Sequence, residues 1–420
     1  HRRAFAASRW TDAARGAASR RSGGGSAGDA DGTRSDQAAG RPRRAAAGKG
    51  LEVLVVERRD TIGVPVQCAE FIPVPLLGEV GLARDFVVQP VRGMETILPD
   101  GAIKVMRAPG FMIRRDLFDQ TLARAAEEAG ARILASTRVL RMEEGEVVVR
   151  SKGEAGEERV MARVIIGADG PCSTVGRWIG SENRNLIPAV QWRVPLTSPM
   201  EHTEVYFHED FYGGYGWLFP SGREANVGLG RKRKNKHDER IGKVLERFVS
   251  RLAEEGKIES RPVRTTAGWI PAEPARKVTK GNVLLVGDAA GHTHPITGAG
   301  VSQAVIGGRM AGKWAARAVD RPAGCAEQLL GGVPGHFWRG RSIPAVGHVG
   351  LQPGGNLYFA RRPGALGAAQ SAAGRFGRWV LRAVLPGNGD HPLILLQGRI
   401  EVALVKKTLR PLEMVPGRKG

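Results

Sequence analysis

The sequence lacks the features that define several protein classes. Its 420 residues contain no apolar run near the roughly 18 residues that a membrane-spanning helix needs, so no such helix is expected. No signal peptide and no internal repeat are visible. The three cysteines, Cys68, Cys172 and Cys325, form no pair with metal-ligand spacing. Their odd number in so long a chain favours a reducing compartment, and we expect a cytoplasmic protein.

Positive charge is abundant, but it is scarce where a nucleic-acid surface would need it. The net charge is +21, yet residues 1–50 carry 11 basic and 4 acidic side chains, and residues 321–420 carry 14 and 4. The segment between them keeps only +4. A nucleic-acid surface is a basic patch on a folded domain, so no nucleic-acid partner is expected. The run Arg231-Lys-Arg-Lys-Asn-Lys236 is interpreted as a solvated loop, with contact to an anionic headgroup or membrane surface as the alternative.

Both ends of the chain lack the periodicity of the middle. Residues 1–49 are rich in Ala, Arg, Gly and Ser and are interpreted as a non-native or disordered segment. The pattern Gly23-Gly-Gly25-Ser-Ala-Gly28 matches G-x-G-x-x-G, but it lacks the preceding apolar strand that a dinucleotide-binding turn requires. Residues 321–420 are expected to form a partly disordered C-terminal region, with helix between Ile400 and Leu409.

The most informative stretch runs from residue 281 to residue 320. The apolar run 282–286 predicts a buried parallel strand that ends at Gly287 and Asp288, and a helical pattern begins at Val301. The Asp288 carboxylate can accept hydrogen bonds from a sugar or ribityl hydroxyl, and the helix N-terminus beside it favours negative charge. The turn between strand and helix contains Gly291, Pro295, Gly298 and Gly300.

Two further junctions place an acid at the end of a strand. The strand 51–56 ends in Glu57, the position of the ribose-binding acid after the second strand of a dinucleotide-binding unit. The strand 163–166 runs into Asp169 and Gly170, and Ser173 is the predicted cap of the helix that follows. The first strand of such a unit, with its glycine-rich turn, is missing from where it belongs.

These junctions together resemble the glutathione-reductase-type FAD fold in its hydroxylase-like branch. Glu57 matches the ribose-binding acid of that fold. Arg115 with Phe118 and Asp119 resembles its R-x-x-F-D helix start. Gly167-Ala-Asp169-Gly170 resembles the DG motif, and Gly287-Asp288 resembles the GD motif. Four elements in this order are a specific signal, and they imply FAD as the cofactor.

Two more motifs resemble the geranylgeranyl reductase family. They are Gly63-Val-Pro-Val-Gln-Cys68-Ala-Glu70 and Tyr215-Gly-Trp217-Leu-Phe219-Pro220. This family comprises flavoproteins that saturate isoprenoid chains, and its archaeal members act on digeranylgeranylglycerophospholipids. The resemblance covers about residues 50–320. It implies an isoprenoid lipid as the substrate.

The fold that this resemblance and the strand patterns predict is α/β, with a Rossmann-like FAD-binding domain, an inserted antiparallel-sheet substrate domain and a C-terminal helical region. Short alternating strands from 188 to 230 predict the inserted sheet, and apolar positions from Ile241 to Leu252 predict an amphipathic helix. The predicted segments are 50–80, 109–185 and 263–320 for the FAD-binding domain, and 81–108 and 186–262 for the substrate domain.

The resemblance also implies the residues of the site. Cys68 is the implied catalytic residue, because the family's cysteine is thought to lie near the flavin, where a thiol can donate a proton or tune access. The alternative is a small buried loop residue, and Glu70 is interpreted as a local ion-pair partner. The implied FAD-binding residues are Glu57, Arg115, Asp169, Gly170, Gly287, Asp288, Gly291, Pro295, Gly298, Gly300 and Val301.

The aromatic motif and a histidine pair complete the candidate residues. Tyr215, Trp217 and Phe219 alternate along a predicted strand, so they share one face. The resemblance implies that this face is a wall for the isoprenoid chain, and packing in the core of the sheet is the alternative. His292 and His294 form an H-x-H pair without a third ligand at suitable spacing, so no metal is expected.

The sequence is thus interpreted as an FAD-dependent reductase that saturates C=C bonds of isoprenoid chains by hydride transfer from flavin N5 plus protonation. Its electron donor is left open among ferredoxin, NAD(P)H and another reduced carrier. Peripheral membrane contact is expected because the family's substrate is a membrane lipid. The alternatives are an FAD-dependent monooxygenase on the same fold and an inactive product that lacks the pyrophosphate-binding turn.

Overall fold

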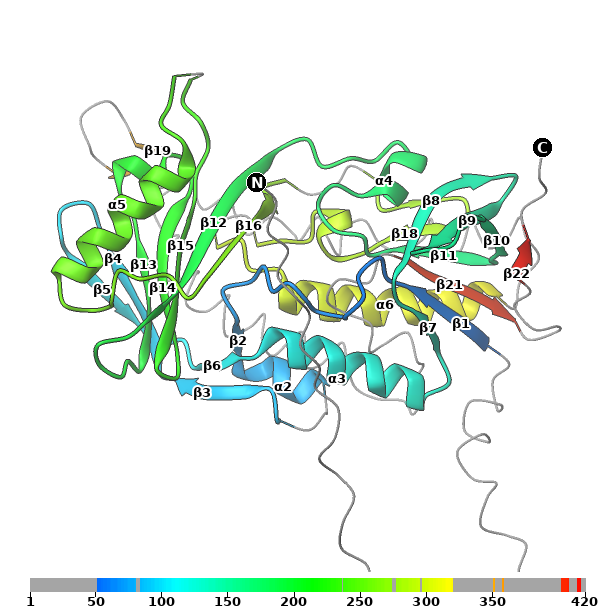
Figure 1. Cartoon of the computed structure of the whole chain (residues 1–420), viewed down its shortest axis with the longest axis horizontal. Coiled ribbons are helices and arrows are strands. Elements are labelled where there is room, and N and C mark those ends of the chain that lie inside the picture. The colour runs from blue at the N-terminus through cyan, green and yellow to red at the C-terminus, as the bar shows by residue number, and fades with distance from the viewer. Residues whose placement is uncertain are drawn as a thin grey trace, which may run out of the picture. The chain divides into compact units, whose positions relative to one another are not determined.

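The computed structural model describes residues 51–80, 84–235, 237–273, 277–294, 297–319, 350–351, 357–358, 402–407 and 414–416. Two sheets dominate it, one of six strands and one of seven strands. Figure 1 labels the strands of these sheets and the helices that lie beside them. None of the described helices is long and apolar enough to cross a membrane.

The six-stranded sheet contains the strands that end at the predicted acids. β1 runs parallel to β7, and β11 runs parallel to β18. The buried apolar residues of β1, β11 and β18 are Val, Ile and Leu, as expected for a sheet that is covered on both faces. The strand order is β17 (Thr279–Lys280), β18 (Val283–Leu285), β11 (Val164–Gly167), β21 (Val402–Lys407), β1 (Leu51–Val56) and β7 (Arg132–Leu134).

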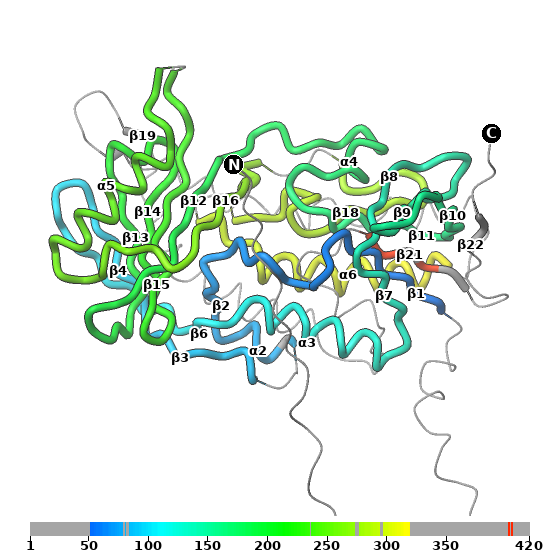
Figure 2. Tube along the Cα trace, in the orientation of Figure 1, coloured from blue at the N-terminus to red at the C-terminus, as the bar shows by residue number. Residues whose placement is uncertain are grey.

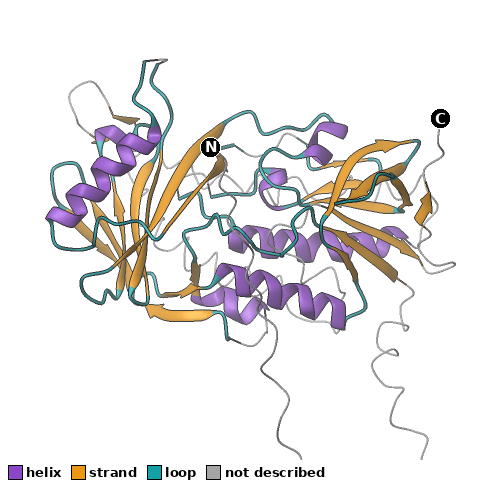
Figure 3. Ribbon diagram, viewed as in Figure 1, coloured by secondary structure: helices purple, strands orange, loops and turns teal. Residues whose placement is uncertain are grey.

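Different layers cover the two faces of this sheet (Figure 3). On one face, Val53 and Val55 pack with Ala126 of α3 (Arg115–Glu128) and Ala315 of α6 (Val301–Val319). On the other, Leu54 and Val56 belong to a cluster shared with α4 and a four-stranded sheet. Those elements are α4 (Thr174–Trp178), β22 (Met414–Pro416), β10 (Glu158–Met161), β9 (Glu146–Ser151) and β8 (Thr137–Glu143).

The seven-stranded sheet is antiparallel except where β13 runs parallel to β4. One face packs against α5 (Ile241–Glu254), whose Leu245, Phe248 and Leu252 are buried against the sheet, so the predicted amphipathic helix is confirmed. The strand order is β16 (Arg264–Pro271), β12 (Leu186–Pro195), β15 (Glu224–Gly230), β14 (Tyr215–Ser221), β13 (His202–Tyr206), β4 (Gly93–Ile97) and β5 (Ile103–Met106).

The remaining described elements are smaller. β2 (Phe71–Pro73), β6 (Gly110–Ile113) and β3 (Val87–Val91) form a three-stranded sheet, in which β3 pairs with β6. The substrate-domain prediction for 81–108 included β3, which pairs outside the seven-stranded sheet. The other elements are α2 (Val74–Val80), η1 (Glu209–Phe211), η2 (Gly287–Ala290), β19 (Gly350–Leu351) and β20 (Leu357–Tyr358).

The C-terminal prediction of helix between Ile400 and Leu409 is wrong for the described part. Residues 402–407 form β21, which lies antiparallel between β1 and β11 (Figure 2). Its backbone finds partners on both sides, and the side chains of Val402 and Val405 are fully buried because layers cover the two faces of the sheet. Most of the remaining predicted C-terminal region and all of segment 1–49 lie outside the described residues.

Candidate cofactor and substrate site

The carboxyl end of β18 brings Asp288 to the N-terminus of α6. Gly287 has φ +58° and Gly291 has φ +66°, left-handed values that favour glycine and allow the short turn of η2. A Cβ added to Gly300 would lie 3.3 Å from Asp288 Oδ1, so the absence of a side chain there lets the carboxylate approach the backbone. α6 begins at Val301, and Gly300 O accepts a hydrogen bond from the Ala304 amide at 2.8 Å. Carboxylate and helix N-terminus are therefore neighbours.

The loop after Asp288 is tied to the seven-stranded sheet. The Tyr215 hydroxyl donates to Thr297 O, and Thr293 Oγ1 donates to Pro271 O at 2.5 Å. Burial raises the pKa of Tyr215 to about 12, so the phenol keeps its proton near neutral pH. Gly298 has φ +62°, which a residue with a side chain would adopt only with strain. Pro295 lies outside the described residues.

Of the two histidines of this loop, His292 is buried and His294 is half-buried. His292 is 4% exposed, and burial lowers its pKa to about 3. Burial also lowers the pKa of His294. Both imidazoles are therefore neutral near pH 7. Among the residues that the structure describes, no group of three or more His, Cys, Asp or Glu side chains could hold a metal ion.

Asp169, at the second junction, caps the helix that follows it. Its Oδ1 accepts from Ser173 Oγ at 2.5 Å, and its Oδ2 accepts from the amides of Thr174 and Val175 at 2.5 and 3.1 Å. Burial raises the pKa of Asp169 above its usual range, although these hydrogen bonds oppose the effect. Gly170 has φ +81° and open space where a side chain would be. The chain itself thus supplies donors to both carboxylate oxygens.

Asn183 joins the DG and GD junctions and was not found by sequence reasoning. Its Nδ2 donates to Pro171 O at 2.8 Å and to Asp288 O at 2.7 Å. The two backbone oxygens come from segments more than a hundred residues apart along the chain. No motif or periodicity marks Asn183, because only the folded sheet brings β11 and β18 side by side.

Glu57 follows β1 as predicted and is 1% exposed. Its Oε1 accepts from the Arg59 amide at 2.9 Å, and its own amide donates to Leu134 O at the end of β7. The carboxylate is therefore oriented by the backbone at the same edge as Asp288, since the carboxyl ends of parallel strands share one edge.

The strand that occupies the central position of the six-stranded sheet determines which parts of FAD the site would fit. In a doubly wound sheet the first strand, with its glycine-rich turn, lies between the second and fourth strands, here β1 and β11. β21 occupies this position in the opposite direction, with Val402 beside Val56 and Gly167 at the site edge. The acids and the α6 N-terminus suit the ribose, ribityl and flavin portions of FAD, whereas the described residues contain no glycine-rich turn for the pyrophosphate.

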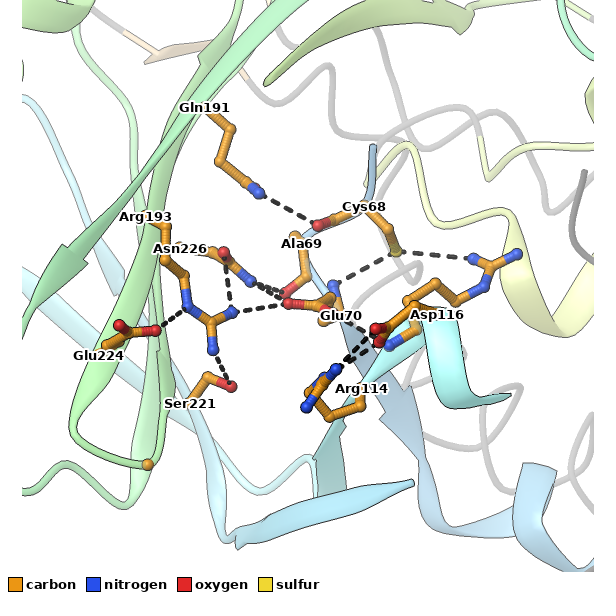
Figure 4. Close-up of polar contacts among 12 residues, drawn as sticks. Cys68, Ala69, Glu70, Arg114, Asp116, Gln191, Arg193, Ser221, Glu224 and Asn226 are labelled. Atoms are coloured by element: carbon orange, nitrogen blue, oxygen red, sulfur yellow. Dashed lines mark hydrogen bonds and ion pairs between the residues drawn. The ribbon is translucent and has the colours of Figure 1, made fainter. Parts of the chain in front are cut away.

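Cys68 lies in a loop that contacts the start of α3 (Figure 4). Its Sγ accepts a hydrogen bond from the Glu70 amide at 3.3 Å and lies 3.7 Å from Arg115 Nη1. Arg115 also forms an ion pair with Asp119, Nε to Oδ1 at 2.8 Å, with both side chains largely buried. The resemblance had grouped Cys68 and Arg115 in one site, and the structure brings them into contact.

Glu70 is not paired locally. Its carboxylate forms an ion pair with Arg193 of β12, Nη1 to Oε2 at 2.7 Å, across 123 positions of sequence. The local interpretation was wrong because the inserted sheet reaches the loop from a distant part of the chain. Gln191 and Arg193 carried a usable signal, since polar residues two apart in an apolar strand mark one polar stripe on its face.

The three aromatic residues of β14 share one face, as the alternation predicted. The ring centroids of Tyr215 and Trp217 are 5.9 Å apart, and Phe219 packs edge-on against Phe71 at 6.3 Å. Trp217 and Phe219 are each 7% exposed within a cluster that includes Met112. Trp217 Nε1 donates to Gln191 Oε1 at 2.9 Å. This face therefore packs on the loop of Cys68 and on β6.

Comparison with known proteins assigns the family. A family model for an FAD binding domain matches residues 82–312. Digeranylgeranylglycerophospholipid reductase 1 of Methanopyrus kandleri is 36% identical over 290 residues, which cover 66% of this chain and 77% of that protein. The chain belongs to the digeranylgeranylglycerophospholipid reductase family. The reductase of the same name from Methanothrix thermoacetophila is 34% identical over 302 residues, covering 66% of this chain and 74% of that one.

Solved structures agree with membership of this reductase family. A geranylgeranyl bacteriochlorophyll reductase-like protein from Thermoplasma acidophilum superposes with a TM-score of 0.61 at 28% identity, covering 71% of this chain and 80% of that chain. A triple mutant of a flavin-dependent brominase, at 17% identity and a TM-score of 0.54 over 71% of this chain and 80% of that chain, shares the fold alone. The predictions of a hydroxylase-like α/β fold, of FAD as cofactor and of an FAD-dependent oxidoreductase are confirmed.

Proposed function

We propose that the protein saturates C=C bonds in the isoprenoid chains of archaeal-type glycerophospholipids. The supporting observation is the 36% identity to a reductase named for such a lipid, over an aligned region that covers two thirds of this chain. The placement of Cys68 beside Arg115, in a loop whose Ala69 packs on the aromatic face of β14, fits this chemistry.

FAD, when bound, supplies the hydride from flavin N5. The residues proposed to hold it are Glu57, Arg115, Asp169, Gly170, Gly287, Asp288, Gly291, Gly298, Gly300 and Val301, with Pro295 proposed from sequence alone. Asp288 would accept hydrogen bonds from ribityl hydroxyls, and Glu57 from the ribose. The N-terminus of α6 would favour negative charge on the reduced flavin.

Cys68 is proposed as the group that delivers a proton to the carbon next to the one that receives hydride. Saturation of an unactivated alkene needs both transfers, and a thiol near the flavin can hold a proton at Sγ. Cys68 is a free cysteine of intermediate burial.

The aromatic face of β14 is proposed as the wall of the lipid site. Tyr215 is the member best placed for substrate contact, because its hydroxyl reaches the loop after Asp288 and its ring is less buried than those of Trp217 and Phe219. Trp217 and Phe219 would support this wall from behind, since each is 7% exposed. Apolar walls suit a chain that offers no hydrogen-bonding groups.

Peripheral membrane contact and the electron donor complete the proposal. β5 is an edge strand with Ile103 56%, Val105 67% and Met106 56% exposed, and Lys104 lies among them. Apolar side chains flanked by positive charge suit an anionic lipid surface. Ferredoxin, NAD(P)H and another reduced carrier remain the candidate donors, and no nucleic-acid partner is proposed.

The proposal is tested by anaerobic turnover. Protein with bound FAD, reduced by dithionite, is incubated with a digeranylgeranylglycerophospholipid in detergent, and the product is analysed by mass spectrometry. We expect the product to gain one pair of hydrogen atoms per saturated bond, and Cys68→Ser to slow this gain. Substrate-stimulated oxygen uptake with a hydroxylated product, and no anaerobic saturation, would instead identify a monooxygenase.

A further inference from the structure

The face of the seven-stranded sheet that meets the Cys68 loop carries a polar stripe. Arg193 pairs in register with Asn226, and Gln191 with Gly228, which is itself opposite Trp217. Residues in register lie on the same face of a sheet, so Gln191, Arg193 and Asn226 all project from the aromatic face of β14. The opposite face is apolar and packs on α5.

Each of these polar side chains contacts the Cys68 loop. Gln191 Nε2 donates to Cys68 O at 3.1 Å, and Asn226 Nδ2 donates to Ala69 O at 3.2 Å. Arg193 Nη1 reaches the Glu70 carboxylate at 2.7 Å (Figure 4). Three successive loop residues are thus held by three side chains from two neighbouring strands.

Glu70 is the centre of this arrangement. It is 2% exposed, its Oε2 also accepts from Asn226 Nδ2 at 3.0 Å, and its Oε1 accepts from the Arg115 amide at 3.0 Å. Its φ of +69° lies in the left-handed region, where a residue with a side chain is strained. The buried hydrogen bonds hold this conformation, and it aims the Glu70 amide at Cys68 Sγ.

The carboxylate therefore acts on the thiol by two routes. It fixes the amide that donates to Cys68 Sγ, and it fixes the backbone of Arg115, whose Nη1 lies 3.7 Å from the same sulfur. Arg193 balances the buried charge and joins both routes to the sheet, with Ser221 and Glu224 as its further partners.

We propose that Glu70 and Arg193 are positioning residues that hold the Cys68 thiol at its working place. They act through Cys68 and Arg115 and need no contact with the lipid. The catalytic part of this proposal rests on the proposed function of Cys68, whereas the placement of the thiol does not.

The first test measures access to the thiol directly. In the holoprotein with Cys172→Ser and Cys325→Ser, Cys68 is the sole cysteine, and iodoacetamide alkylation at about pH 9.5 reports exposure of Sγ, because an ordinary thiol is mostly ionised there. We expect Glu70→Gln to speed alkylation about fivefold or more, since the loop opens more often. Glu224→Gln is the matched control, because it removes the same charge from Arg193 without touching the loop, and it should leave the rate nearly unchanged.

The second test asks whether Glu70 acts on turnover through Cys68. We expect Glu70→Gln to lower kcat about tenfold with KM for the lipid nearly unchanged, and to have no further effect when Cys68→Ser is already present. The proposal would be overturned if Glu70→Gln lowered kcat by the same factor with Cys68 present and with Cys68→Ser. It would also be overturned if Cys68 were alkylated at the same rate in Glu70→Gln and in Glu224→Gln. If Cys68→Ser leaves kcat unchanged, the proposed catalytic role of Cys68 fails. The alkylation rates of Glu70→Gln and Glu224→Gln then decide by themselves whether Glu70 positions the thiol.

Arg193→Lys is a second variant that tests the proposal if Glu70→Gln does not fold. Arg193→Lys keeps the buried positive charge but loses the fork that reaches Glu70, Ser221 and Glu224 together. We expect its alkylation rate to rise as well, by a smaller factor. A wild-type rate in folded Arg193→Lys would contradict the role assigned to Arg193.

Discussion

His292 should make the free energy of unfolding of the protein fall at acidic pH. Its imidazole is 4% exposed and lines a small cavity with Leu284 and Met310, and burial lowers its pKa to about 3 from the ordinary 6.5. Below pH 6.5 the unfolded chain therefore binds a proton at this residue that the folded chain does not bind. The contribution to stability is fully present above pH 6.5 and is lost as the pH falls toward 3.

The size of the loss follows from the difference in protons bound. Each pH unit below 6.5 removes about 1.4 kcal/mol, so the free energy of unfolding at pH 5 should be lower by about 2 kcal/mol on account of His292. The variant His292→Gln stays neutral at every pH and should lack this slope. The difference in slope between the two proteins isolates His292 from the titration of the carboxylates.

The assay is urea unfolding followed by tryptophan fluorescence at about pH 7, 6 and 5 and constant ionic strength. His237→Gln, in an exposed loop, is the control and should keep the pH dependence of the unchanged protein. Parallel curves for the unchanged protein and His292→Gln between pH 7 and 5 would refute the reasoning, because they would mean that His292 takes up its proton inside the fold.

Three further predictions concern the site and the sheet. Asp169→Ala should lower the free energy of unfolding by about 1–2 kcal/mol in the same urea assay, because α4 loses its carboxylate cap; an unchanged midpoint would contradict this role. Gly300→Ala should weaken FAD binding about tenfold by flavin fluorescence, since its Cβ would crowd Asp288, whereas Gly242→Ala, with open space around it, should not. Val405→Asp should destabilise the six-stranded sheet by about 3 kcal/mol or more, because it places an unpaired charge at a fully buried position; circular dichroism showing native stability would exclude β21 from the core.

The parts of the fold that the sequence predicts well are those governed by local rules. Gly287 and Gly170 mark tight turns after apolar strands, and both have the positive φ that such turns need. The helix of 241–254 shows its buried face as a 3.6-residue period. Alternation alone places Tyr215 and Trp217 on the same face of β14.

The parts that the sequence does not predict depend on which segments meet in space. The run 402–407 suits a helix or a strand, and the open position between β1 and β11 decides for a strand. Asp169 has the same sequence signature whether it binds a cofactor or caps α4, and only the distances show the cap. The pair Glu70–Arg193 is invisible because sequence spacing says nothing about a partner 123 positions away.

A single sheet face contacts both loops that border the site. Tyr215 donates to Thr297 O in the loop after Asp288, and Gln191 donates to Cys68 O, while Trp217 Nε1 donates to the Gln191 side chain. Both contacts lie on one hydrogen-bonded sheet, so its strands set the separation of the Cys68 loop from the loop after Asp288. Because function resides in sites carried by a fold, substitutions on β12, β14 and β15 that break these contacts should change the placement of both loops while leaving the strand–acid junctions of the six-stranded sheet intact.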